Sequence, residues 1–281
     1  MQNSGNGKNT EHGLASKVLK RGNAWIEYRT MGSGPGVVLI PSLGRGAEDF
    51  DLLATDLARL GYRVVQPEPR GIGGSSALNK GDALNDMAAD IAAIIETEQL
   101  APAVLVGHAA GNWVARVLAH DRPDLTRAVA LVAAIVTRTP SDDIRASISG
   151  SFDPSLSDAE RLAHLERAYF APGADARVWL DGWWPDVARL QREAARQTTD
   201  DNWKPVAHAH STLYLGAAND IISPPPTLNE LRSAIGPKAS LKVIPQAGHA
   251  LLPEQPQAVT DCLHEWMSEL SPVEGDDTAD D

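Results

Sequence analysis

Short apolar runs alternate with segments of helical periodicity along most of this chain of 281 residues. The runs at 36–40, 63–66, 103–106, 128–132, 212–215 and 241–244 have the length of buried strands, and the stretches at 47–60, 84–98, 112–120, 227–235 and 256–270 have the length of helices. Strands that alternate with helices form βαβ units, whose right-handed crossovers place helices on both faces of the sheet. The sequence therefore predicts an α/β fold with a mostly parallel central sheet.

Two segments depart from this alternation. Residues 24–29 alternate apolar and polar side chains, which predicts an antiparallel strand. Residues 140–209 contain no clear strand, carry a capping-box pattern at 157–160, and hold four of the seven tryptophans. We expect a helical cap at 140–209, inserted into a core made of residues 16–139 and 210–271.

The net charge of −12 and the single cysteine restrict the partners and the compartment. An acidic chain repels phosphate backbones and anionic lipids, so neither nucleic acid nor a membrane is an expected partner. Cys262 has no second cysteine to pair with, and no apolar stretch reaches the roughly 18–20 residues that cross a bilayer. We expect a cytoplasmic protein with a disordered leader at 1–15 and an acidic disordered tail at 272–281.

Residues 107–111 read Gly-His-Ala-Ala-Gly and lie between the predicted strand at 103–106 and the predicted helix at 112–120. In that position a G-x-S-x-G segment forms the nucleophile elbow, a tight turn that lifts its central side chain above the sheet. The two glycines leave room for neighbouring backbone, and the central residue often has strained dihedral angles. Here the central residue is Ala109, whose methyl group cannot attack a carbonyl carbon.

Two further polar residues follow predicted strands in the order of a catalytic triad. Asp220 comes after the strand at 212–215, and His249 follows a glycine on the loop after the strand at 241–244. A carboxylate so placed can orient a histidine that acts as general base. Asn219 is the adjacent alternative, but an amide does not stabilise an imidazolium, so Asp220 is the expected acid.

The loop after the strand at 36–40 supplies backbone donors. The N–H groups of Leu43 and of Ala110 are the expected oxyanion hole. Ser42, on the same loop, and His108, in the elbow, are expected near the substrate. In the cap, Trp183 and Trp184 are the expected roof of an apolar pocket, although adjacent side chains point in different directions and at most one of the two should line it.

Together these segments make the chain resemble the α/β-hydrolase superfamily, in its single-domain form with a helical cap. The matching stretches are 38–50, 67–75, 107–111, 220–225 and 248–253. The resemblance implies an α/β-hydrolase fold in which Asp220 orients His249 and position 109 carries the nucleophile. The chain departs from the family pattern at Pro41-Ser42, where members usually have His-Gly, and at Ala109, where a serine is expected.

Because the acid and the histidine are both retained, we interpret Ala109 as a replacement that inactivates a serine hydrolase. The parent enzyme would cleave a carboxylic ester or a lactone of a small, largely apolar substrate. Two alternatives stay open: a non-catalytic small-molecule binder on the same fold, and a cofactor-free oxygenase or lyase that uses the His–Asp pair without a nucleophile.

No cluster of His, Cys, Asp and Glu has metal-ligand spacing, and no G-x-G-x-x-G opens a helix after a strand. The sequence therefore predicts neither a metal nor a cofactor. The expected partner is a small ester or lactone, and the sequence leaves a homodimer open.

Overall fold

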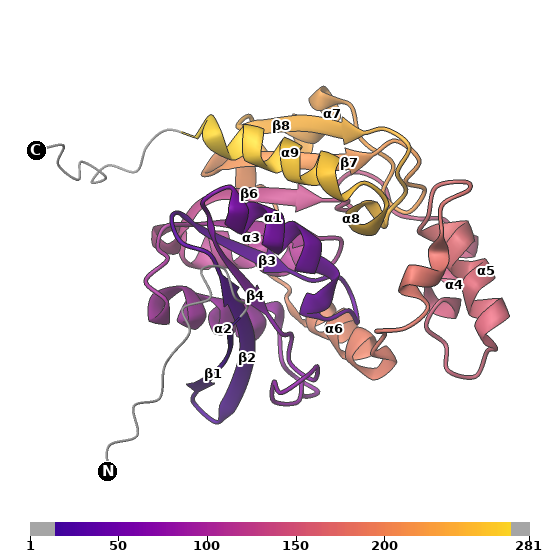
Figure 1. Cartoon of the computed structure of the whole chain (residues 1–281), viewed down its shortest axis with the longest axis horizontal. Helices are drawn as coiled ribbons and strands as arrows, with labels where there is room; N and C mark the ends of the chain where they lie inside the picture. The colour runs from indigo at the N-terminus through magenta and orange to yellow at the C-terminus, as the bar shows by residue number, and fades with distance from the viewer. Residues whose placement is uncertain (1–14, 271–281) are drawn as a thin grey trace, which may run out of the picture.

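The computed structural model describes residues 15–270, in which eight strands form one sheet in the order β1-β2-β4-β3-β5-β6-β7-β8 (Figure 1). The strands are β1 (Ala15–Arg21), β2 (Ala24–Met31), β3 (Gly36–Ile40), β4 (Arg63–Pro67), β5 (Ala103–His108), β6 (Thr126–Val132), β7 (Ser211–Ala217) and β8 (Ala239–Ile244). β1, β2 and β4 pair antiparallel, and every pair from β4 to β8 is parallel. The prediction of a mostly parallel sheet is confirmed.

Helices lie on both faces of this sheet, as predicted. The core helices are α1 (Asp51–Arg59), α2 (Leu84–Thr97), α3 (Gly111–Asp121), α7 (Leu228–Ile235), α8 (Leu251–Glu254) and α9 (Pro256–Ser268), with 3₁₀ turns η1 (Ala47–Phe50), η2 (Pro123–Leu125) and η4 (Val206–His208). The buried clusters place α2, α3 and α7 against one face, and α1, α8 and α9 against the other. The predicted helix at 47–60 begins as the 3₁₀ turn η1.

Alternation along the central strands explains the two-sided core. In β3, Val38 and Ile40 pack on the face covered by α2 and α3, whereas Val37 and Leu39 pack on the opposite face. All four side chains are buried, since a parallel strand covered on both faces is apolar at every position. Burial of each such side chain stabilises the fold by roughly 1.5–3 kcal/mol before the entropy cost is counted.

β1 is a strand that the sequence argument missed, and Ala15, assigned to the leader, is its first residue. The strand lies at the edge of the sheet, is largely exposed and carries three basic residues. Gly22, with φ of +58°, turns the chain directly into β2. Charged edge strands are common because charge discourages pairing with other chains, but the same charge hides the strand from a search for apolar runs. Residues 1–14 of the predicted leader, the predicted acidic tail at 272–281 and the last predicted core residue, 271, lie outside the described residues.

The segment between β6 and β7 is helical in this structure and contains no strand. Its helices are α4 (Asp142–Gly150), α5 (Asp158–Ala168), the 3₁₀ turn η3 (Ala176–Trp179) and α6 (Pro185–Gln197). The capping box predicted for α5 is present, with Ser157 Oγ accepting from the Glu160 N–H and the Ser157 N–H donating to Glu160 Oε2. α4 and α5 pack together at one side of the sheet (Figure 1), and α6 contacts α2.

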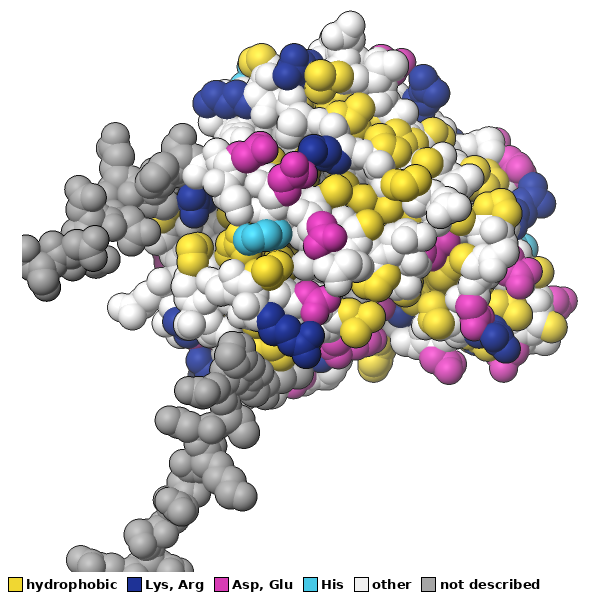
Figure 2. All heavy atoms as spheres, turned by 45° about the horizontal axis from the view of Figure 1, so that its top comes forward, with side chains coloured by type: hydrophobic (Ala, Val, Ile, Leu, Met, Phe, Trp, Pro, Cys, Tyr) yellow, Lys and Arg dark blue, Asp and Glu magenta, His cyan; other side chains and the backbone are white. Residues whose placement is uncertain are grey.

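Charges of both signs are interspersed over the face drawn in Figure 2, where lysine and arginine side chains occur singly or in small groups among acidic ones. Within residues 15–270, no helix is long and apolar enough to cross a membrane.

Candidate active site

The turn between β5 and α3 has the geometry of a nucleophile elbow. Ala109 stands at its tip with φ of +44°, a left-handed conformation that costs a non-glycine residue about 1–3 kcal/mol. A Cβ on Gly107 would lie 2.7 Å from Asn112 Cα, and one on Gly111 would lie 2.2 Å from the carbonyl oxygen of Ile40. Both glycines are therefore required, because backbone occupies the space that a side chain would need.

Hydrogen bonds hold this turn in place. The Ala109 N–H donates to the carbonyl oxygen of Val132 at 2.8 Å, which ties the elbow to the end of β6. The Ala109 carbonyl oxygen accepts from the N–H of Asn112 at 3.2 Å and also from the Asn112 side-chain amide. The elbow is thus a fixed platform for whatever side chain stands at position 109.

Asp220 and His249 lie together, from the loops after β7 and β8. His249 Nδ1 is 2.9 Å from Asp220 Oδ2, and both side chains are buried. The other carboxylate oxygen accepts from the N–H groups of Ile222 and Ser223, and Ser223 Oγ donates to Oδ2 at 2.6 Å. Burial alone would raise the pKa of Asp220, but His249 and these hydrogen bonds outweigh burial and hold that pKa below its usual range. Asp220 is therefore ionised at neutral pH.

The tautomer of His249 follows from this contact. A carboxylate only accepts, so the proton sits on Nδ1 and Nε2 keeps its lone pair. Among the described residues, Nε2 has no hydrogen-bond partner. The His249–Asp220 pair can thus take a proton at Nε2 while the carboxylate stabilises the resulting imidazolium.

The loop after β3 presents the expected oxyanion donors. Within residues 15–270, neither the Leu43 N–H nor the Ala110 N–H donates a hydrogen bond. The next N–H along the loop, that of Gly44, is held by the side chain of Gln191 from α6 at 2.8 Å. The loop conformation is therefore fixed by the cap, and its free N–H at Leu43 is available to a ligand.

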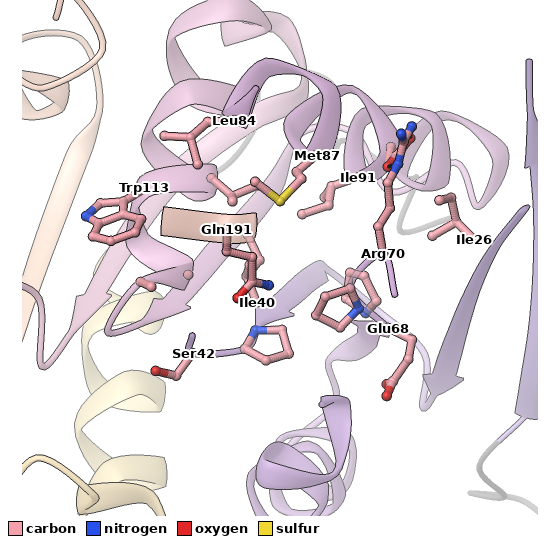
Figure 3. Close-up of a pocket in the computed structure, with 17 residues that line it drawn as sticks. Ile26, Ile40, Ser42, Glu68, Arg70, Leu84, Met87, Ile91, Trp113 and Gln191 are labelled. Atoms are coloured by element: carbon pink, nitrogen blue, oxygen red, sulfur yellow. Dashed lines mark hydrogen bonds and ion pairs between the residues drawn. The ribbon is translucent and has the colours of Figure 1, made fainter. Parts of the chain in front are cut away.

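Two cavities border this loop and the elbow. The wider cavity, of about 440 Å³, is lined by Leu43, Ala110, Trp113 and Tyr169, among others. The narrower cavity, of about 50 Å³, lies between the strand ends and α2 and is mostly apolar, as Leu84, Met87 and Ile91 illustrate (Figure 3). Gln191 and Ser42 contribute polar atoms to its wall. Ala110 and Trp113 border both cavities, so the two cavities adjoin beside the elbow.

His108 is fully buried beside the His249–Asp220 pair. Burial, reinforced by the neighbouring His249, lowers the pKa of His108 to about 3, so its ring is neutral. Its Nε2–H donates to the carbonyl oxygen of His249 at 3.0 Å, and its Nδ1 has no partner among the described residues. His108 thus lies between the elbow and the loop that carries His249.

The predicted cap tryptophans lie in different surroundings. Trp183 packs against Trp179, Tyr169 and Phe152, and its indole N–H donates to the Trp179 carbonyl oxygen. Trp184 is 43% exposed. Neither borders the two cavities above, whereas Trp113 of α3, which the sequence argument passed over, borders both. Trp113 follows the elbow by one helical turn, a position that could have drawn attention to it.

Comparisons with known proteins identify the family of this chain. Residues 37–261 match the model of the Alpha/beta hydrolase family. BpoC of Mycobacterium tuberculosis is 29% identical over 266 residues, covering 87% of this chain and 98% of BpoC. The sn-1-specific diacylglycerol lipase ABHD11 of Mus musculus is 27% identical over 252 residues, covering 83% of this chain and 81% of the lipase.

Solved structures share the fold. The crystal structure of BpoC superposes with a TM-score of 0.74 at 24% identity, covering 88% of this chain and 97% of BpoC. A thermophilic esterase from Thermogutta terrifontis superposes with a TM-score of 0.72 at 20% identity, covering 92% of this chain and all of the esterase, 100%. The chain belongs to the alpha/beta hydrolase family, and its fold is the α/β-hydrolase fold that the sequence predicted.

Proposed function

We propose that this chain has the binding and proton-transfer apparatus of a serine hydrolase that cleaves a carboxylic ester or a lactone, with alanine at the nucleophile position. The proposal rests on one observation: one proton acceptor and two hydrogen-bond donors that could act on a reacting carbonyl surround the elbow. They are the Nε2 lone pair of His249 and the unengaged N–H groups of Leu43 and Ala110. Within residues 15–270, none of these three groups has a hydrogen-bond partner.

A serine at position 109 would allow the two-stage reaction of a serine hydrolase, acylation followed by hydrolysis of the acyl-serine. Its Oγ attacks the carbonyl carbon while His249 Nε2 takes its proton, and the N–H groups of Leu43 and Ala110 hold the oxyanion. His249 then returns the proton to the leaving alcohol, which leaves an acyl-serine. Water attacks the acyl-serine, again losing its proton to His249, and the acid and the free serine are released. With Ala109 the chain binds the ester without cleaving it.

The lining of the two cavities supports a small substrate with a largely apolar part. Leu84, Met87 and Ile91 can receive a short alkyl group behind the oxyanion loop. The wider cavity, with Trp113 and Tyr169, can receive the other side of the ester. The two sides of the scissile bond would then occupy different cavities.

The experiment is a paired assay of this chain and its Ala109→Ser variant on aryl esters, alkyl esters and lactones. We expect hydrolysis by the serine variant alone, since loss of a triad nucleophile costs about 10⁶ in turnover in a serine protease. The double variant Ala109→Ser, His249→Gln is the control and is expected to be inactive.

Two outcomes contradict the proposal. Equal turnover by both chains means that His249 and Asp220 act without a serine, as in an oxygenase or a lyase. An inert serine variant that still binds esters means a binding protein whose pocket never served catalysis.

A further inference from the structure

The wider cavity beside the elbow is lined by three arginines. Arg145 comes from α4, and Arg192 and Arg196 come from α6 one turn apart, so that their side chains share a face of that helix. The same cavity includes Leu43 and Ala110, whose N–H groups form the candidate oxyanion hole. A cluster of positive charge therefore lies in the same cavity as the site where a carbonyl would react.

Arg192 has no acidic partner. Among residues 15–270 it forms no ion pair and no hydrogen bond, and its guanidinium lies 5.5 Å from the centre of the Phe152 ring. Arg196 likewise forms no ion pair within the described part of the chain, whereas Arg145 lies 3.5 Å from Asp142. By contrast, Arg189 on the same helix lies 3.7 Å from Asp186. The lack of an acidic partner for Arg192 and Arg196 is unexpected, because the chain has 37 acidic residues and only 25 basic ones.

The surroundings of Arg192 make an unpaired cation costly. Burial lowers the pKa of Arg192, Tyr169 acts against that shift, and repulsion from Arg196 adds to it. A half-buried guanidinium without a counterion loses hydration that nothing replaces. An anion that enters the cavity restores those interactions, and a planar guanidinium accepts a carboxylate through two parallel hydrogen bonds.

We propose that the substrate of this site carries a carboxylate, which Arg192 holds while Arg196 adds positive potential. The scissile carbonyl then lies at the N–H groups of Leu43 and Ala110, and the apolar part extends into the narrower cavity. This proposal rests on the proposed hydrolase function and narrows its substrate class to acid-bearing esters.

The first experiment measures binding to the chain with Ala109, which leaves esters intact. The probes are monoethyl glutarate and its methyl ester, which differ in the negative charge and carry no activated leaving group that the free carboxylate could expel, with the corresponding succinate and adipate pairs to vary the reach. Calorimetric titration at low and high salt is expected to show about tenfold tighter binding of at least one acid over its methyl ester, and a weaker preference in high salt. Equal affinity within all three pairs overturns the proposal.

Variants then assign the preference. Arg192→Met is expected to reduce the preference for the acid over its methyl ester to about twofold or less. Arg192→Lys is expected to retain part of this preference, because a lysine keeps the charge without the planar fork. Arg189→Met is the control and is expected to leave the preference unchanged, because Arg189 pairs with Asp186 and does not line the wider cavity. A preference that survives Arg192→Met overturns the assignment, provided that the variant has an unchanged circular dichroism spectrum.

The Ala109→Ser variant separates this proposal from the one on which it rests. Hydrolysis of the methyl esters without any preference for the acids contradicts only the carboxylate site. A binding preference without hydrolysis of any probe contradicts only the hydrolase function. Faster hydrolysis of the acids, lost on Arg192→Met, supports both.

Discussion

At the scale of single residues, His108 connects the elbow to the histidine loop. Its neutral ring donates one hydrogen bond to the carbonyl oxygen of His249, and the two rings are 5.6 Å apart. Burial and the neighbouring His249 both lower the pKa of His108. We therefore predict that His108 positions His249 and does not itself supply a proton.

Removal of this contact is expected to slow the reaction. The variant His108→Phe, made in the Ala109→Ser background, keeps a buried ring but loses the N–H. We expect its kcat to fall about tenfold or more with a smaller change in KM, because small displacements of a catalytic group are costly. His108→Gln keeps a donor and should retain more activity. The measurement is a pH–rate profile with separate kcat and KM. His120→Gln, at the exposed end of α3, is the control, and an unchanged kcat in His108→Phe would contradict the positioning role.

At the scale of elements, α6 holds the oxyanion loop from the cap. The Gly44 N–H donates to Gln191 Oε1 at 2.8 Å, and the Gly44 carbonyl oxygen accepts from the Trp184 N–H at 2.9 Å. Gly44 has φ of +62°, and a Cβ there would lie 2.8 Å from the Ala188 side chain. The helix and the loop therefore fit only with glycine at this position.

Gln191→Leu tests this connection. The variant leaves the buried Gly44 N–H without an acceptor, which costs about 1–3 kcal/mol and should lower Tm by several degrees. In the Ala109→Ser background, kcat should fall as well, because the neighbouring Leu43 N–H loses its fixed position. Thermal unfolding and ester hydrolysis measure the two effects. Gln197→Leu, exposed near the end of α6, should change neither, and a Gln191→Leu variant with parental Tm and kcat would refute the role of α6.

The strength of the local signal decides which elements could be predicted. The strands from β3 to β8 and the helices α2, α3, α7 and α9 carry clear apolar patterns, and all were predicted, as were Asp220 and His249, now 2.9 Å apart. β1 was missed because an exposed edge strand has little apolar content. Trp113 and Arg192 were missed for a different reason. Periodicity indicates which face of a helix is apolar, but not which cavity the remaining side chains border once the cap has docked.

At the scale of the whole molecule, two buried titratable groups outside the catalytic pair tie stability to pH. The pKa of Glu68 is raised to about 7, chiefly by burial and also by the nearby Glu48 and Glu27. Two contacts oppose this rise: the Ala47 N–H, which donates to the Glu68 carboxylate at 2.9 Å, and the charge of Arg29. Between its ordinary pKa of 4.5 and about 7, the folded state binds more protons at Glu68 than the unfolded state does, so stability falls as pH rises through this window. His108 acts in the opposite direction, since between pH 6.5 and about 3 only the unfolded state takes up its proton and stability falls as pH falls.

Glu68→Gln isolates the first of these effects. The amide oxygen can still accept from the Ala47 N–H, while the cost of ionising a buried carboxyl disappears. At pH 8 we expect the free energy of unfolding of the variant to exceed that of the parent by about 1–2 kcal/mol, which corresponds to roughly 2–8 °C in Tm. This gain is smaller than the full pKa shift implies, because Arg29 and solvent screen the charge of Glu68. Near pH 4.5 the two proteins should unfold together, since Glu68 is then protonated in the folded parent. Thermal unfolding followed by circular dichroism from pH 4.5 to 8 measures the difference, with Glu166→Gln on the exposed face of α5 as the control. A gain that is equal at both ends of the range, or that grows toward acid, would show that Glu68 is ionised in the fold throughout and that its burial carries no pH-dependent cost.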